Sequence, residues 1–156
     1  MLAGRYEAKL GKKFQISFPK RFRNEMGDKL ILTKGLDENL IIVSEKNWET
    51  LLEGTKGLPF TNKSARELQR FLLGNVFELE IDNKGRFLIP EFLRDYAHLK
   101  EDVVFLGIDR FVELWNKDTW EKYQKDLSLR VESIAEKLSE RNLGDDSKWK
   151  IIMSAS

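Results

Sequence analysis

The sequence contains the same stretch twice, 71 residues apart, and this repeat constrains the fold more than any other feature. Both copies place apolar residues at strand spacing, then a short polar turn, two more apolar residues and a proline. The matched pairs are Leu10 with Ile81, Lys13 with Lys84, Ile16 with Phe87, Phe18 with Ile89, Pro19 with Pro90, Phe22 with Leu93 and Arg23 with Arg94. Later matches follow at an offset of 72: Gly35 with Gly107, Asp37 with Asp109, Ser44 with Asn116 and Trp48 with Trp120. One module has therefore been used twice.

The second copy has a complete turn, which runs from Asp82 to Arg86. The apolar residues that flank it predict two strand ends joined as a hairpin, with Gly85 in a left-handed conformation. Asp82 can accept hydrogen bonds from backbone N–H groups of the turn, and Arg86 is close enough to pair with it. Pro90 then suits the first turn of a short helix.

The first copy lacks this turn chemistry, because Gly11, Phe14 and Gln15 replace the aspartate, the glycine and the arginine. A residue other than glycine in a left-handed conformation costs roughly 1–2 kcal/mol. Either the turn has changed shape, using Gly11, or another contact offsets this cost. The Phe14 side chain could stack on a base, pack on a neighbouring subunit or be buried, and the last two are preferred.

The remaining pattern predicts an α+β protein with a mainly β core. We expect strands at residues 1–10, 16–18, 30–32, 40–43, 103–106 and 112–115, with turns near 35–39 and 107–109. Helices are expected after Pro19, after a Ser44 cap, after a Thr61 or Asn62 cap, after Pro90 and from Lys117.

These elements predict four segments: a first module at 5–47, a helical connector at 48–75, a second module at 76–119, and a C-terminal helix and tail at 120–156. Apolar residues in the last helix recur three or four positions apart, which is typical of an association seam. They are Trp120, Tyr123, Leu127, Val131, Ile134 and Leu138. A homo-oligomer larger than a dimer is the expectation.

Composition excludes several classes of function. The chain has no cysteine and one histidine, which rules out thiolate chemistry and leaves little for a metal site. We predict no catalytic residues, no metal and no cofactor. The absence of a long apolar run predicts a cytoplasmic protein with no membrane partner.

Charge is distributed unevenly although the formal net charge is only +1. Residues 1–25 carry seven bases and two acids, whereas residues 74–100 carry four bases and five acids. An anionic partner should therefore favour the opening of the first module.

At this point the residues resemble a known family. The phrase Asp-x-x-Gly-Arg-x-x-x-Pro resembles the AbrB/SpoVT swapped-hairpin modules, and the layout of about residues 1–125 resembles the MraZ family of bacterial transcriptional regulators. Supporting stretches are Tyr6-Glu7, Pro19–Arg23, Leu58-Pro59, Ala65-Arg66 with Arg70, and Val112–Trp115 followed by Trp120.

The resemblance implies that the two modules form one double-psi-type β-barrel unit with flanking helices. It also implies ring-shaped homo-oligomers that bind double-stranded DNA at repeated promoter elements of a cell-division and cell-wall gene cluster. The resemblance further implies that the protein is associated with the nucleoid and binds no small-molecule ligand. The rival interpretation is a ring-forming scaffold with weakened DNA binding.

The predicted DNA-binding residues combine the family motif with the basic opening of the chain. Arg86 either neutralises Asp82 and stiffens the turn, or is oriented by Asp82 to contact a phosphate or a guanine edge, and both roles can coexist. Gln15 can hydrogen-bond a base edge but cannot replace a guanidinium charge. The full set is Arg86, Asp82, Lys84, Gln15, Lys12, Lys13, Lys20, Arg21, Arg23 and Arg5.

Overall fold

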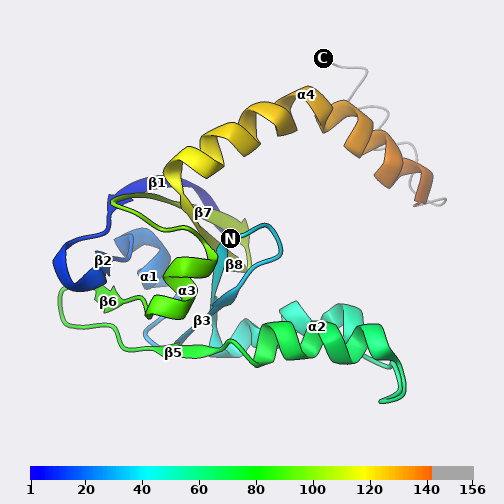
Figure 1. The fold of residues 1–156 in the computed structure, drawn as a ribbon, viewed down its shortest axis with the longest axis horizontal. Helices are drawn as coiled ribbons and strands as arrows, with labels where there is room; N and C mark the ends of the chain where they lie inside the picture. Colours follow the sequence, from blue (N-terminus) through cyan, green and yellow to red (C-terminus); the bar gives the residue numbers. More distant parts are fainter. Residues whose placement is uncertain (142–156) are drawn as a thin grey trace. The chain divides into compact units, whose positions relative to one another are not determined.

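Both copies of the strand and turn pattern, at 10–23 and 81–94, lie in the first of two units of the structure, a computed structural model that describes residues 1–141 (Figure 1). The first unit ends at Lys117, and the second begins at Asp118. The predicted tail at 142–156 lies outside the described residues. In chain order the elements are β1 (Leu2–Lys9), η1 (Lys12–Phe14), β2 (Gln15–Ser17), α1 (Lys20–Met26), β3 (Leu30–Lys34), β4 (Leu40–Ser44), η2 (Glu45–Thr55), α2 (Lys63–Leu73), β5 (Phe77–Leu79), β6 (Arg86–Leu88), α3 (Glu91–Tyr96), β7 (Asp102–Asp109), β8 (Phe111–Asn116) and α4 (Lys117–Arg141).

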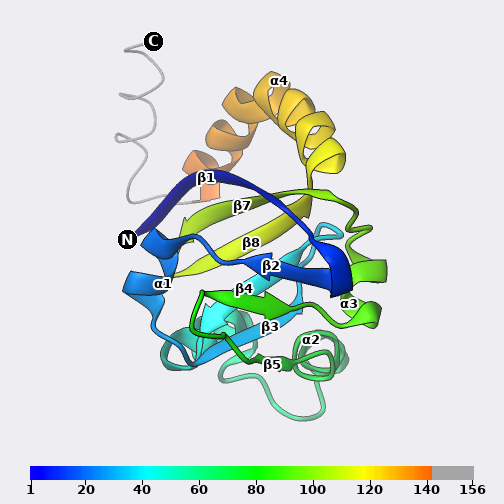
Figure 2. The same ribbon diagram turned by 90° about the vertical axis from the view of Figure 1, so that its left-hand side faces the viewer.

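The strands show that the two modules exchange their first strands. Six strands form one antiparallel sheet in the order β1-β7-β8-β4-β3-β5, and β2 pairs with β6 in a separate ribbon (Figure 2). If each strand is replaced by its repeat equivalent, the six-strand order simply reverses. The unit therefore has a pseudo-twofold axis, on which Ile16 of β2 faces Phe87 of β6.

This architecture confirms the α+β class with tandem modules. Strands β1 and β5 are the two edges of the six-stranded sheet, so the pairing of the described strands does not close it into a barrel.

The second turn forms as predicted, but the prediction that its two flanking strands pair as a hairpin is wrong. Strand β5 pairs with β3, and β6 pairs with β2, so the strands on either side of the turn separate. The reason is burial: pairing β2 with β6 brings Ile16 and Phe87, both 1% exposed, together in the core. A local hairpin would leave each of them without this partner.

Aromatic rings of the two modules pack on one another in the core. Phe18, 4% exposed, packs on Phe22 of its own module and on Phe87 and Phe105 of the second module. Tyr6 packs edge-to-face on Phe22 at a ring-centroid distance of 4.9 Å. The core is therefore shared between the repeats, and the ring of Phe22 fixes α1 to it.

The predicted turn at 107–109 comes too early, because these residues all belong to β7, and Gly107 faces Gly4 of β1. The chain turns only at the end of this strand, where Asp109 has a left-handed φ of +58°. Strand β1 runs so close to Gly107 that a Cβ atom there would lie 2.4 Å from the backbone nitrogen of Ala3. A glycine at this position therefore lets the backbones of β1 and β7 pack closely.

We expect Gly107→Ala to lower the free energy of unfolding by about 1–3 kcal/mol, because β1 must shift to make room. Urea denaturation at fixed protein concentration measures this change. Gly54→Ala is the matched control, since a Cβ at Gly54 meets nothing within 4 Å. Equal stability of the two variants would show that β1 yields without cost.

The helix caps follow the prediction, but one helix differs in type. Ser44 Oγ accepts a hydrogen bond from the Asn47 N–H at 3.3 Å, and Asn62 Oδ1 accepts one from the Ala65 N–H at 3.0 Å. The segment after Ser44 is the 3-10 helix η2 rather than an α-helix.

In the second unit, α4 confirms the predicted C-terminal helix. Two residues of its apolar seam, Val131 and Leu138, are 53% and 45% exposed, and Leu129 beside them is 87% exposed. Across residues 1–141, none of the helices combines the length and the apolar character needed to cross a membrane.

Candidate nucleic-acid interface

The two turns of the repeat lie at opposite ends of the β2–β6 ribbon. Each turn directly precedes its strand, and the two strands are antiparallel. Because of the exchange, each turn meets the other module's helix. Phe18 N–H donates to the Gly85 carbonyl at 2.8 Å, and Ile89 N–H donates to the Phe14 carbonyl at 3.2 Å. These bonds are equivalent under the offset of 71 residues, so the ribbon fixes both turns in the same way.

The second turn holds Arg86 in a defined orientation. Asp82 Oδ1 accepts the N–H groups of Lys84 and Arg86, each at 2.9 Å, and Asp82 Oδ2 accepts Arg86 Nε at 2.9 Å. Gly85 has a φ of +78°, as predicted. The Arg86 side chain is 41% exposed, and no other described residue hydrogen-bonds its terminal nitrogens. Asp82 thus accepts a hydrogen bond from Nε of Arg86, and the two terminal nitrogens of the guanidinium remain for a partner.

The pKa of Asp82 is lowered, first by the Arg86 N–H and then by the Arg86 side chain and the Lys84 N–H, against the opposing effect of desolvation. A carboxyl whose pKa falls on folding stabilises the fold above its unfolded pKa of about 3.9, and this contribution is lost as pH drops through the folded value.

We therefore expect the Asp82 carboxyl to titrate below about pH 3.9, with the amide signals of Lys84 and Arg86 shifting in the same step. A carbon-detected NMR titration measures the midpoint. The Asp82→Asn variant is the control, since it should lose the step at both amides. A midpoint at or above about 3.9 would contradict the hydrogen bonding described here.

The first turn keeps the closing backbone hydrogen bond of the second but differs from it at Lys13, which is left-handed where its equivalent Lys84 is not. Gly11 N–H donates to the Gln15 carbonyl at 2.9 Å, just as Asp82 N–H donates to the Arg86 carbonyl at 2.9 Å. Phe14 has a φ of +61°, so the turn has kept the left-handed position without a glycine. Lys13 is also left-handed, with a φ of +63°.

A contact with the second module offsets the cost at Phe14. The guanidinium carbon of Arg94 lies 3.3 Å from the centroid of the Phe14 ring. Such a stack contributes about 0.5–2 kcal/mol, which is comparable to the cost of the left-handed conformation. Phe14 is 50% exposed, so the expectation of burial is wrong, and the alternative of a contact with a neighbouring subunit stays a prediction.

Two of the three basic residues of α1, Lys20 and Arg23, lie at the second turn, which belongs to the other module. Lys20, Arg23 and Asn24 line one hollow together with Asn83, Lys84 and Gly85. Arg23 Nε also donates to Asp28 Oδ1 at 3.2 Å. The sequence assigned this charge to the first module alone, because the exchange of partners cannot be read from local pattern.

The remaining predicted residues are exposed but differ in their partners. Arg5 forms an ion pair with Glu7 at 3.0 Å, and Arg21 Nη1 donates to the Tyr6 hydroxyl at 3.2 Å. No described residue forms an ion pair with the ammonium groups of Lys12, Lys13, Lys20 and Lys84. Gln15 is exposed at the other end of the ribbon from Arg86.

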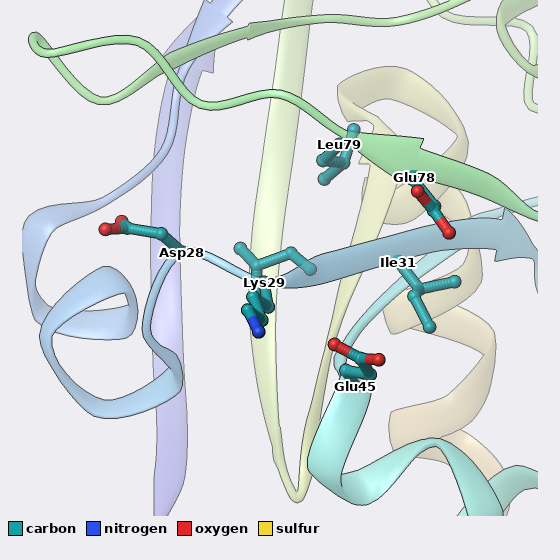
Figure 3. Close-up of a pocket in the computed structure, with 7 residues that line it drawn as sticks. Asp28, Lys29, Ile31, Glu45, Glu78 and Leu79 are labelled. Atoms are coloured by element: carbon teal, nitrogen blue, oxygen red, sulfur yellow. The ribbon is translucent and has the colours of Figure 1, made fainter.

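A second hollow, of about 310 Å³, is unsuited to phosphate. Asp28, Glu45 and Glu78 line it with only one base, Lys29. Figure 3 shows the carboxylates of Glu45 and Glu78 beside Ile31 of β3, with Asp28 pointing away from both. Within residues 1–141 no group of three or more histidine, cysteine, aspartate or glutamate side chains is placed to hold a metal ion.

Comparison with known proteins finds the same repeat. A family model described as "MraZ protein, putative antitoxin-like" matches twice, at residues 1–71 and 72–142. Proteins named "Transcriptional regulator MraZ" from Caldanaerobacter subterraneus subsp. tengcongensis and Thermoanaerobacter pseudethanolicus are each 43% identical over 143 residues, covering 92% of this chain and all of theirs. The protein of that name from Acetivibrio thermocellus is 42% identical over 139 residues, covering 89% of this chain and 97% of its own.

The fold and the two turns define a pseudo-symmetric α+β protein in which two modules exchange strands and present polar turns at either end of a ribbon. With both halves matched by the family model, the chain belongs to the MraZ family. The resemblance stated from the Asp-x-x-Gly-Arg phrase is confirmed.

Proposed function

We propose that the chain is a sequence-specific, double-stranded DNA-binding transcriptional regulator. The observation that carries this proposal is the second turn, where Asp82 orients Arg86 and leaves its terminal nitrogens exposed. A guanidinium held in this way can contact the O6 and N7 atoms of guanine or a backbone phosphate. The relatives that match nearly the whole chain are named transcriptional regulators, and none of their names denotes an enzyme.

The exposed lysines supply the sequence-independent part of this binding. Lys12 and Lys13 at the first turn and Lys20 and Lys84 at the second are exposed, and phosphate contacts from such groups position a protein on DNA. The proposal extends to repeated promoter elements of a cell-division and cell-wall gene cluster, and to a cytoplasmic, nucleoid-associated location.

We further propose that the chain acts as a ring-shaped homo-oligomer. The exposed apolar residues of α4, Leu129, Val131 and Leu138, support an association surface on that helix. Light scattering at micromolar concentration should give a species larger than a dimer, and a monomer would rule the ring out. Removal of residues 128–156 tests whether the helix is needed.

The test of function is a salt titration of binding to a duplex from the chain's own upstream DNA, with a scrambled duplex of equal length as the control. Affinity for both should fall steeply as salt rises, with the upstream duplex bound more tightly at every salt concentration. Failure to bind either duplex at low salt would favour the ring-forming scaffold. The first turn, which lacks the aspartate and the arginine of the motif, supports this alternative.

For Arg86→Ala we expect binding to the upstream duplex to weaken by about 1–3 kcal/mol, while binding to the scrambled duplex changes much less. Fluorescence anisotropy at fixed salt measures both, after light scattering has shown that assembly is intact. Arg110→Ala is the matched control, since it removes the same charge from an exposed side chain between β7 and β8 that is outside the predicted DNA-binding set. Unchanged discrimination by Arg86→Ala would restrict Arg86 to stiffening the turn.

A further inference from the structure

The hollow between α1 and the second turn, of about 300 Å³, has a composition that suits an anion. Three of its lining side chains are basic, two are amides and none is acidic. They are Lys20, Arg23, Lys84, Asn24 and Asn83, with Phe18 and Gly85 completing the lining. The residues come from both modules, so the hollow exists only because the strands are exchanged.

Gly85 keeps this hollow open. It is buried, its φ is +78°, and a Cβ atom there would lie 3.1 Å from Arg23 Nη1. Any side chain at this position would therefore press on the guanidinium. The bond from Phe18 N–H to the Gly85 carbonyl, at 2.8 Å, ties the turn to the segment that leads into α1.

The pseudo-equivalent place at the other end of the ribbon carries acids as well as bases. Phe14 stands where Gly85 would be, and its ring lies on Arg94, the equivalent of Arg23. Glu91 replaces Lys20 and Asp95 replaces Asn24, while Lys12 replaces Asn83, so this set has three bases and two acids instead of three bases and none. An aromatic ring stands at the position that Gly85 leaves open, so the hollow between α1 and the second turn suits an anion better than its equivalent does.

We propose that the hollow between α1 and the second turn is a seat for a single phosphate group, held jointly by Lys20 and Lys84, and that in the complex this is a DNA backbone phosphate. The DNA part of the inference rests on the proposed function. Arg23 Nε is already bonded to Asp28, which leaves its terminal nitrogens as the guanidinium donors beside Gly85. Ammonium, guanidinium and amide donors around one site match the several acceptor oxygens of a phosphate.

The first test is additivity of the salt slope. Lys20→Gln, Lys84→Gln and the double variant are titrated with the upstream and scrambled duplexes over a series of salt concentrations. If both lysines hold one phosphate, each single variant lowers the slope by about one, and the double variant lowers it by no more than that. A drop of about two in the double variant, or none in the singles, overturns the shared seat. Lys63→Gln on α2 controls for the loss of a charge.

The second test places an acid in the seat without changing its shape. Asn24→Asp reproduces the aspartate found at the equivalent position 95, and should weaken binding to both duplexes about tenfold. Asn47→Asp on η2 makes the same change of charge elsewhere and should have less than a twofold effect. Equal weakening by the two variants would overturn the seat in favour of a general charge effect.

A third measurement separates the seat from the function. Inorganic phosphate at constant ionic strength should raise the Tm of the wild-type chain, and raise it less for the double lysine variant. If wild type binds neither duplex yet shows this difference, the proposed function is overturned and the seat takes free phosphate. If wild type binds DNA and the variants behave like it, the seat is overturned and the function stands.

Discussion

Replacement of Phe18 by alanine is expected to lower the free energy of unfolding by about 3–5 kcal/mol. The side chain is 4% exposed, and its ring centroid lies 6.1 Å from that of Phe22, 6.0 Å from Phe87 and 5.5 Å from Phe105. Two of these rings belong to the second module, so the truncation opens a cavity at the junction of the modules. Denaturant unfolding at one fixed chain concentration measures the loss.

Phe60→Ala is the matched control for this prediction. Phe60 is 86% exposed, so its truncation should change stability by no more than about 0.5 kcal/mol. If Phe18→Ala costs no more than Phe60→Ala, the ring cluster does not hold the two modules together, and the strand ladders alone must do so.

Restoration of the first turn is expected to sharpen sequence discrimination. The triple change Gly11→Asp, Phe14→Gly and Gln15→Arg should favour the upstream over the scrambled duplex by up to about 1–3 kcal/mol per recovered base contact. The structure makes this plausible because the backbone bond from Gly11 N–H to the Gln15 carbonyl is already formed. An aspartate at position 11 would stand at the place equivalent to Asp82, at the start of a turn closed by the same backbone bond.

The control for the triple change removes charge without touching the motif. Lys12→Ala with Lys13→Ala should weaken both duplexes alike and reduce the salt slope by up to about two. If the restored chain discriminates no better than the native one, the first turn does not face DNA. The basic opening of the chain would then be a subunit contact or a solvated surface.

Features set by neighbouring residues were predictable from the sequence. The Ser44 and Asn62 caps and the turn from Asp82 to Arg86 depend on side chains that reach two to four positions along the chain. The repeat itself was also visible, and the family match at 1–71 and 72–142 has the same period. The predicted boundaries of the modules remain a prediction.

Features set by partners far along the chain were not predictable. Local pattern showed that Ile16 and Phe87 lie in strands, but not that these strands face each other across a pseudo-twofold axis. Gly107 looked like a turn glycine because the approach of Ala3 comes from the other end of the unit. The stack of Phe14 on Arg94 was not predictable either, because it joins two modules whose exchange of strands the local pattern does not show.

The exchange of strands also bears on how the two turns could diverge. Two identical modules that traded β1 and β5 as separate chains would form a symmetric dimer, in which any substitution occurs at both turns at once. In one covalent chain each turn mutates alone, while the shared core keeps both in place. A turn that no longer carries the aspartate and arginine can then be tolerated, because its neighbour retains them. Neither half can be expected to fold as an excised fragment, since its first strand belongs to the other half's sheet.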